Sequence, residues 1–484
     1  MVEPINKEFP CGVSIPFNNP HAVSVSLPTL NDVIRYEEFD ENIRQTMQSG
    51  YPRFFTNRLV QKVVAKLADS VANPCTILPI ADSKAVDLIE NKFGSVELLS
   101  LGDVKAVMLT PMDARTQPIK DFIQHTGLIA TSRRAEESLI GEQIFTSRFD
   151  EERINSEAES VIQSVLAGGY GVNATDVLLA NTGMNALYSV YSALQQVKDK
   201  EKKVFVRLGW QYLDTMEILT KYGETVDFSD EEQFAQYIKE NYKTVNAVFC
   251  EIPNNPLLQI VNLPEISHLL KGYGIPLIID SSMATPFTFR LMEYADVVVE
   301  SLTKFACGNA DVIMGAIVLN YKSPMYSQLL EVCSKTCVKP FVADMQRLAH
   351  EITDYKTRVV SLSEITKELR ERLRVSKKVK QLFCVDEKSS VFKSFASEDN
   401  NSIVPPILSV VFNEPLDKYY NSLQCAKGPS FGTEFTLSMA YVYMAHYDLI
   451  QSIEGEKTLG RYGLDKNLMR VSVGYDALEV FKNF

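Results

Sequence analysis

Short apolar segments alternate with amphipathic segments of helical length between about residue 152 and residue 300 of this 484-residue chain. Apolar runs that alternate with helices are typical of parallel strands joined by crossover helices and buried on both faces of a sheet. The strands are expected at Asp176–Leu179, Lys203–Leu208, Thr225–Phe228, Val245–Cys250, Ile275–Ile279 and Val297–Val299. The pattern therefore predicts a large α/β domain built on a mostly parallel sheet.

Two further regions flank this domain. Residues 1–135 start with a proline-rich stretch and continue as a small α/β unit in which no catalytic group is obvious. The elements expected there are a helix at Arg58–Val71, a strand at Cys75–Ala81, a helix at Ser83–Phe93, and strands near Val96–Leu99 and Ala106–Leu109. We predict an N-terminal extension at 1–135, the large domain at 136–325 and a smaller C-terminal α/β domain at 326–484.

Composition restricts the partners of the chain. A net charge of −12 argues against nucleic acid or an anionic membrane, because both carry negative charge. No apolar run has the length needed to span a bilayer, and the N-terminal MVEPINKEFP lacks the basic region and apolar stretch of a secretory signal. The expected location is the cytoplasm, with the nucleus possible.

Three polar residues follow predicted strands at regular intervals. Asn255, Asp280 and Lys304 are separated by 25 and 24 residues, and each comes just after a strand of the same sheet. Ligands of open parallel sheets bind at the carboxyl ends of the strands, so these side chains are expected to face one crevice. An isolated Asp at a strand end is usually a cap or a surface group, and only the order and spacing of the three favour a site.

These residue types suit one cofactor. A desolvated lysine has a lowered pKa, and its neutral amine can form a Schiff base with an aldehyde. An aspartate can pair with a protonated pyridine nitrogen and keep the ring an electron sink. The hydroxyls of Ser301 and Thr303, and the backbone N–H groups that start the helix after Asn181, can bind a phosphate. The residues therefore predict a site for pyridoxal 5′-phosphate.

Five segments, in order, carry a resemblance to the Cys/Met-metabolism pyridoxal-phosphate enzymes. SLTKFACGNADVIMGAIV resembles their lysine motif S-x-T-K-Y-x-x-G-H-S-D-x-x-x-G, and IIDSSMATP resembles V-D-N-T-F-x-T-P. EIPNNP, NTGMNA and LMRVSVGYD are similar to E-x-P-x-N-P, S-S-G-M-A-A and L-x-R-x-S-V-G-x-E. The match covers roughly residues 145–484. GVSIPFNNPHAVSVSLPT and SFGTEF most resemble the fungal cystathionine γ-synthase branch.

The resemblance implies a fold-type I transferase. Its aminotransferase-like large domain would hold a mostly parallel seven-stranded sheet, beside a smaller C-terminal α/β domain and, in this chain, an extra N-terminal α/β region. The implied cofactor is pyridoxal 5′-phosphate. The implied assembly is a homodimer or homotetramer with sites built across the dimer interface.

The resemblance also implies roles for individual residues. Lys304 would hold the cofactor and shuttle protons, and Asp280 would pair with the pyridine nitrogen. The phosphate would be bound by Gly183, Met184, Ser301 and Thr303. Arg470 would clamp the substrate α-carboxylate with its two-pronged guanidinium, and Asn255 and Ser430 would lie beside that carboxylate.

Two of the implied site positions depart from the family pattern. The family stacks a Tyr on the ring; here the loop reads Leu208-Gly209-Trp210-Gln211-Tyr212, and either Trp210 or Tyr212 could stack. Trp210 aligns slightly better, although a core or interface position suits a Trp equally well.

The second departure concerns the phosphate. The family brings a Y-x-R pair to the phosphate from the neighbouring subunit. Tyr51-Pro52-Arg53 has these letters but lies about 130 residues before Gly183, whereas Arg148 lies 35 residues before it. Arg148 is therefore the residue expected at the phosphate.

The reaction that the resemblance implies is γ-replacement. O-Acetylhomoserine, or another O-acylhomoserine, would react with cysteine to give cystathionine. One alternative is direct sulfhydrylation, in which sulfide gives homocysteine, and a third is a lyase that acts on cystathionine. A non-catalytic relative that binds the cofactor, or a partner through residues 1–135, is the alternative from another class. The presence of Lys304, Asp280 and Arg470 argues against it.

Overall fold

The computed structural model describes residues 9–197, 201–397 and 403–484. Residues 1–8, which make up most of the N-terminal stretch MVEPINKEFP, lie outside these ranges. Within them, the strands form sheets of seven, five, three and two strands. No helix of the described residues combines the length and the apolar character needed to cross a membrane.

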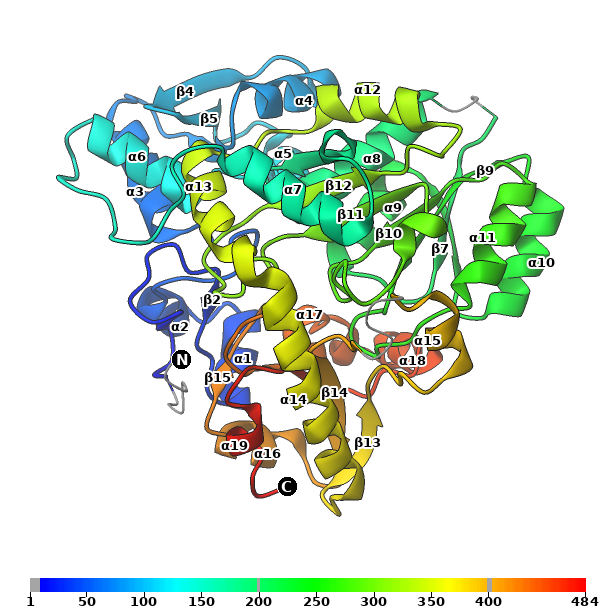
Figure 1. Cartoon of the computed structure of the whole chain (residues 1–484). Coiled ribbons are helices and arrows are strands. Elements are labelled where there is room, and N and C mark those ends of the chain that lie inside the picture. Colours follow the sequence, from blue (N-terminus) through cyan, green and yellow to red (C-terminus); the bar gives the residue numbers. More distant parts are fainter. Residues whose placement is uncertain (1–8, 198–200, 398–402) are drawn as a thin grey trace.

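The seven-stranded sheet forms the centre of the large domain (Figure 1). Its strands are β6 (Val177–Ala180), β7 (Val204–Leu208), β8 (Glu224–Phe228), β9 (Val245–Glu251), β10 (Leu277–Asp280), β11 (Val297–Ser301) and β12 (Gly315–Leu319). They lie in the order β6-β12-β11-β10-β9-β7-β8, and only β12 runs antiparallel to its neighbours. The predicted mostly parallel seven-stranded sheet is confirmed.

Helices cover both faces of this sheet. One face carries α7 (Ala158–Tyr170), α10 (Glu231–Asn241) and α11 (Leu263–Gly272); the other carries α8 (Gly183–Val197), α9 (Leu213–Tyr222) and α12 (Tyr326–Thr336). Successive strand residues point to opposite faces, so Ile278 of β10 enters one core and Ile279 the other. Because both faces are buried, each strand is a nearly continuous run of apolar residues, and this pattern allowed the strands to be predicted from the sequence.

A smaller domain follows the helices α13 (Val342–Glu351) and α14 (Tyr355–Val375). Its five strands are β13 (Val379–Phe383), β14 (Ile407–Phe412), β15 (Ala426–Lys427), β16 (Leu437–Ala440) and β17 (Met469–Ser472), in the order β13-β14-β17-β16-β15. Its short helices are α15 (Ser390–Phe395), α16 (Leu416–Ser422), α17 (Tyr441–Ala445), α18 (Ile453–Arg461) and α19 (Ala477–Val480). Arg470 lies on the central strand β17 of this sheet.

A separate α/β unit is inserted before the large domain. It consists of α3 (Arg58–Asp69), β3 (Thr76–Ile80), α4 (Ser83–Phe93), β4 (Glu97–Leu101), β5 (Val104–Leu109), α5 (Thr116–Thr126) and α6 (Ser132–Gly141). The three strands pair antiparallel in the order β3-β5-β4. We call residues 58–141 the inserted unit. The five elements predicted there lie within a few residues of α3, β3, α4, β4 and β5, and the Asp82 side chain caps the start of α4. Helices α5 and α6 were not predicted.

Residues 9–57 do not belong to that unit. Their elements are β1 (Ser14–Ile15), β2 (Ser24–Val25), α1 (Leu30–Glu37) and α2 (Glu41–Thr46). They pack against the C-terminal domain, where Leu27 and Val33 share a core with Leu408 and Tyr420 (Figure 1). The predicted extension 1–135 is therefore two structures with different neighbours. We call residues 9–57 the N-terminal segment.

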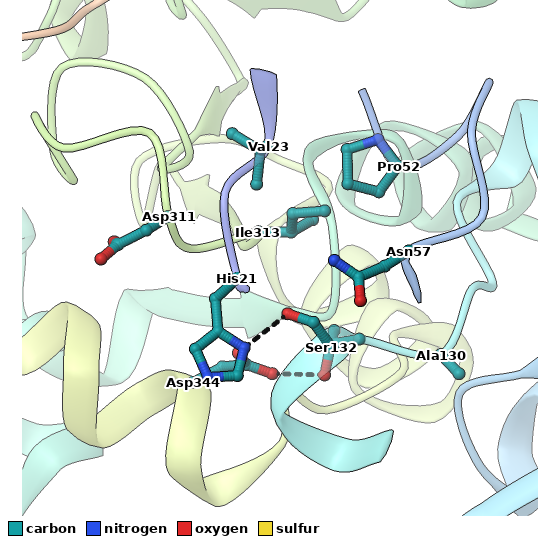
Figure 2. A pocket seen from close by; sticks show the side chains of 10 residues that line it. His21, Val23, Pro52, Asn57, Ala130, Ser132, Asp311, Ile313 and Asp344 are labelled. Carbon is teal, nitrogen blue, oxygen red and sulfur yellow. Dashed lines mark hydrogen bonds between the residues drawn. The ribbon is translucent and has the colours of Figure 1, made fainter. Parts of the chain in front are cut away.

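Buried polar groups fix the N-terminal segment to the rest of the chain. Figure 2 shows a small pocket where its His21 points toward Ser132 of α6, with Nδ1 3.0 Å from the Ser132 Oγ. The Asn57 amide donates to the Pro20 carbonyl at 2.9 Å, and the Val23 N–H donates to the Ala310 carbonyl at 2.8 Å. The chain is therefore anchored on both sides of residues 51–53.

Candidate active site

A pocket of about 1120 Å³ lies at the carboxyl ends of β9, β10 and β11. The central sheet, the C-terminal domain, the N-terminal segment and the inserted unit all contribute to its wall. The predicted residues that line it are Gly183, Met184, Tyr212, Asn255, Asp280, Ser301, Thr303, Lys304, Ser430 and Arg470. The strand ends thus meet as the crossover topology requires.

Lys304 is buried in the turn after β11, with 7% of its surface exposed. Its Nζ lies 3.2 Å from the Tyr51 Oη and 2.9 Å from the Ser430 Oγ. Burial lowers the pKa of Lys304, so its amine loses a proton, and becomes nucleophilic, more easily than that of a lysine in water. Gly432 permits this contact: a Cβ there would lie 2.6 Å from the carbonyl carbon of Lys304, and its φ of +81° suits glycine.

Asp280 is the last residue of β10, and it lines the pocket. It accepts a hydrogen bond from the Ser282 N–H at 2.9 Å. Burial raises the pKa of Asp280, and the bonds from Ser282 oppose this rise. A desolvated carboxylate of this kind is stabilised as an anion by a cationic N–H partner, which a protonated pyridine ring can provide.

The start of helix α8 forms the corner predicted for a phosphate. Gly183 begins the helix, and a Cβ there would lie 2.9 Å from the Ser301 Cβ, so glycine lets the two segments approach. The helix N-terminus presents N–H groups and a positive dipole end to this corner. Thr303 lines the pocket too, but its hydroxyl accepts from the Met314 N–H at 3.2 Å and thereby also braces its own loop.

Arg470 and its partners form the opposite side of the pocket. The Arg470 Nη1 donates to the Asn255 Oδ1 at 2.9 Å, and its Nη2 donates to the Ser430 carbonyl at 2.8 Å. Burial lowers the pKa of Arg470, whose guanidinium nevertheless stays charged at any physiological pH. A buried, oriented guanidinium in a pocket wall is suited to bidentate binding of a carboxylate.

Of the two residues considered for stacking on the ring, Trp210 does not line the pocket and takes the core position that was the other interpretation. Its ring packs against Tyr462 and His446, with centroids 4.8 and 5.0 Å away, in an apolar cluster of the C-terminal domain. Tyr212, the alternative, lines the pocket. The chain turns at Gly209, whose φ is +80°, and the Glu251 carboxylate accepts from the Tyr212 N–H at 2.8 Å. These tertiary contacts orient the irregular loop, and sequence periodicity does not describe them.

Arg148, expected at the phosphate from the neighbouring subunit, lies apart from the pocket of its own chain. Its side chain is 61% exposed, pairs with Glu137, and does not line the pocket. Tyr51 and Arg53 line it instead, from the same chain as Lys304. The inserted unit begins at residue 58 and its chain returns to the large domain, so a separation of about 130 residues along the sequence does not separate these groups in space. The letters Y-x-R at 51–53 were the signal that could have identified the pair.

Arg53 is held by a buried acid that the sequence analysis missed. Its guanidinium bonds the Asp214 carboxylate and the Tyr212 hydroxyl. The other oxygen of Asp214 lies 2.7 Å from the His125 Nδ1.

Burial by itself would raise the pKa of Tyr51, but the charges of Lys304 and Arg53 lower it. The pocket therefore holds a tyrosine that gives up its proton more easily than usual.

Comparison with known proteins adds independent findings. A family model described as Cys/Met metabolism PLP-dependent enzyme matches residues 111–482. The L-2-amino-4-chloropent-4-enoate dechlorinase/desaturase of Streptantibioticus cattleyicolor is 31% identical over 471 residues, covering 95% of this chain and 94% of that protein. The cystathionine gamma-synthase of Neurospora crassa is 25% identical and covers 98% of this chain and 97% of that protein.

Solved structures resemble the fold. The cystathionine gamma synthase of Xanthomonas oryzae pv. oryzae, in complex with aminoacrylate and cysteine, superposes with a TM-score of 0.58 at 18% identity. That superposition covers 67% of this chain and 84% of the other. The cystathionine gamma-lyase from yeast gives a TM-score of 0.57 at 21% identity, covering 66% and 82%. At such identities the likeness concerns the architecture.

Proposed function

Because the chain belongs to the Cys/Met metabolism PLP-dependent enzyme family and has its fold-type I architecture, we propose that it exchanges a leaving group on the γ-carbon of an α-amino acid. The favoured substrate is O-acetylhomoserine or another O-acylhomoserine, and the favoured nucleophile is cysteine, which gives cystathionine. The observation that carries the proposal is the buried set of Lys304, Ser430 and Arg470, which supports a base and a carboxylate clamp in one pocket.

The residues present fit pyridoxal 5′-phosphate, the cofactor of the family. Lys304 would attach it, Asp280 would face its ring nitrogen, and Tyr212 would lie on the pocket wall beside the ring. The start of α8 at Gly183, with Ser301, would hold its phosphate. When bound, this cofactor supplies an electron-accepting ring that stabilises negative charge on a substrate carbon.

Lys304 is the group that would move protons. Burial lowers the pKa of Lys304, which makes the neutral Nζ, the form that can take the α-proton of a substrate, easier to reach. The Tyr51 and Ser430 hydroxyls lie within hydrogen-bond distance of this Nζ and would aim it. In the overall replacement the Cγ–O bond breaks with loss of the carboxylate, a Cγ–S bond forms, and the cysteine thiol gives up its proton.

Arg470 would bind the α-carboxylate of the amino acid. Its guanidinium is oriented by Asn255 and by the Ser430 carbonyl before any substrate arrives. Such preorganisation reduces the entropy that is lost on binding and places the α-carbon reproducibly near Lys304. Ser430 thus orients both groups that act near the α-carbon of the substrate: its carbonyl orients Arg470, and its hydroxyl orients Lys304.

A second candidate follows from one specific relative. The name of the S. cattleyicolor protein describes removal of chloride from carbon 4 of an amino acid, which is the γ-carbon, and this relative is 31% identical over 95% of the present chain. A γ-chloride and a γ-acyloxy group both leave from the same atom. Elimination from a chlorinated amino acid is therefore the second candidate, and sulfhydrylation with sulfide is the variant with another nucleophile.

Product analysis separates these reactions. Purified protein loaded with pyridoxal 5′-phosphate would receive O-acetylhomoserine with equal cysteine and sulfide, and mass spectrometry would identify the products. Mainly cystathionine supports the proposal, and mainly homocysteine assigns a sulfhydrylase. A parallel reaction with 2-amino-4-chloropent-4-enoate would be followed by chloride release. Lys304→Ala is the control: turnover by this variant contradicts the mechanism, and a coloured wild-type protein with no turnover supports a non-catalytic relative.

We also infer that the protein is cytoplasmic and assembles as a homodimer or homotetramer. The first inference rests on the eight cysteines, which are all free thiols as is usual in a reducing compartment, and the second on the family resemblance. Light scattering during gel filtration measures the mass of the assembly, to be compared with the 54.4 kDa of one chain. Imaging of a tagged full-length protein tests the location.

A further inference from the structure

A chain of buried hydrogen bonds links the inserted unit to the pocket. His125, near the end of α5, places its Nδ1 2.7 Å from one oxygen of Asp214 on α9. The other oxygen of Asp214 bonds the guanidinium of Arg53, which lines the pocket. These three residues come from the inserted unit, the large domain and the N-terminal segment. One carboxylate therefore joins three parts of the molecule.

Asp214 depends on its two donors. Its residue is 0% exposed, and a buried carboxylate without donors is strongly destabilising. The contacts of His125 determine which nitrogen carries the proton. The Lys221 Nζ lies 3.1 Å from the His125 Nε2, and an ammonium group only donates, so Nε2 accepts and Nδ1 donates to Asp214. Lys221 is itself neutralised by Glu217 at 3.1 Å, with Asp121 at 3.9 Å.

The same turn of the inserted unit touches the start of α8. A Cβ on Gly127 would lie 1.9 Å from the Thr182 Oγ1, and the φ of Gly127 is +67°. The Thr182 hydroxyl and the Asn181 amide both donate to the Gly127 carbonyl, at 3.2 and 3.3 Å. Residues 125–127 therefore brace two different groups of the pocket, the start of α8 directly and Arg53 through Asp214.

We propose that His125 is a positioning residue of the active site, which orients Asp214 so that Asp214 holds Arg53 toward the phosphate of the cofactor. This proposal rests on the proposed function, because it takes pyridoxal 5′-phosphate as the ligand. The inserted unit is then part of the cofactor site, although none of its side chains needs to contact the cofactor. Loss of the His125 donor leaves Asp214 with one partner and lets Arg53 turn away from the phosphate.

Two ligands that differ only in the phosphate test this proposal. The protein stripped of cofactor would be titrated with pyridoxal 5′-phosphate and with pyridoxal, and binding would be followed by visible absorbance. His125→Leu should weaken binding of the phosphate form by roughly tenfold, the usual scale for a lost hydrogen bond to a charged group, and leave pyridoxal binding unchanged. His125→Asn keeps an N–H donor and should restore most of the loss. His268→Leu, at an exposed position of α11, is the matched control.

A double-mutant cycle tests the route through Arg53. Arg53→Gln should lower the preference for the phosphate form at least as much as His125→Leu does, and the double variant should lose no more than Arg53→Gln alone. Additive losses, or an unchanged preference in either single variant, overturn the proposal. Retained pyridoxal binding shows that a variant is folded. If the wild-type protein binds neither ligand, the proposed function fails instead, so the two failures are distinguishable.

Discussion

The Nζ of Lys304 lies 2.9 Å from the Oγ of Ser430, a residue 126 positions later in the chain. Ser430 adopts a left-handed φ of 85°, which is uncommon for any residue other than glycine. Residues in such conformations cluster at functional sites, where the surrounding structure maintains the strain. The contact brings together the end of β11 in the large domain and a loop of the C-terminal domain. Ser430 is therefore the first residue to substitute.

Ser430→Ala should lower kcat by roughly tenfold while the protein stays folded, because Lys304 keeps only the Tyr51 hydroxyl as a hydrogen-bond partner. Steady-state kinetics and circular dichroism measure the two quantities. Ser430→Gly is the companion variant, since it removes the hydroxyl and relieves the left-handed conformation. Both variants should lose activity to a similar extent. Full activity in the glycine variant would assign the effect to the backbone and contradict a role for the hydroxyl.

Gly183→Ala should weaken cofactor binding by about tenfold or more, because its Cβ would meet the Ser301 Cβ at 2.9 Å and force open the phosphate corner. Equilibrium titration with pyridoxal 5′-phosphate measures the change. Gly168→Ala is the control: it lies in α7, and no atom within 4 Å would meet its Cβ. That variant should bind the cofactor normally. Equal effects of the two substitutions would argue against a close approach at Gly183.

Arg470→Lys should lower kcat/KM by about 10²-fold, mainly through KM, because an ammonium group cannot reproduce the two-pronged contact with a carboxylate. Initial rates over a range of O-acylhomoserine concentrations measure the effect. Arg372→Lys is the control, since Arg372 lies on α14, donates to the Leu478 carbonyl of α19, and does not line the pocket. If Arg470→Lys binds substrate as well as the wild type, the α-carboxylate is bound elsewhere.

Lys304→Ala and Arg53→Gln should not complement each other. In this structure Arg53 and Lys304 of one chain line the same pocket, so a mixed assembly of the two variants holds no site with both residues intact. Differently tagged variants would be co-expressed, and the mixed assembly purified through both tags and assayed. Each variant alone is the baseline. Clear recovery above that baseline would mean that Arg53 serves the site of a neighbouring subunit.

Acid should destabilise the protein as the pH falls from about 6.5 to about 4, because of one buried histidine. Burial lowers the pKa of His446 to about 4, below its usual 6.5. The unfolded chain therefore binds this proton first, so the contribution of neutral His446 is complete above pH 6.5 and is lost as the pH falls toward 4. The lost free energy of unfolding is roughly 3 kcal/mol.

The single tryptophan reports this change, because the Trp210 ring lies 5.0 Å from His446. Urea unfolding followed by Trp210 fluorescence, at several pH values, measures the free energy of unfolding. His446→Phe should remove that part of the pH dependence. An unchanged pH dependence in this variant would show that other buried groups are responsible.

The sequence was sufficient for the large domain and for the site residues at its strand ends. Asn255, Asp280 and Lys304 follow strands that are apolar on both faces, and a parallel sheet collects the carboxyl ends of its strands at one edge. That argument uses only local pattern and a general rule of topology. It therefore needs no knowledge of how the side chains pack.

Tertiary structure alone decided the groups that come from other parts of the chain. Tyr51 and Arg53 reach the pocket because the N-terminal segment packs on the C-terminal domain, and Trp210 leaves it because its loop is oriented by contacts with that domain. Distance along the sequence says little about such contacts, since an insertion can fold on itself and return the chain to nearly the same place. The sequence thus determined the sheet and the chemistry at its edge, while long-range packing determined which remaining side chains complete the site.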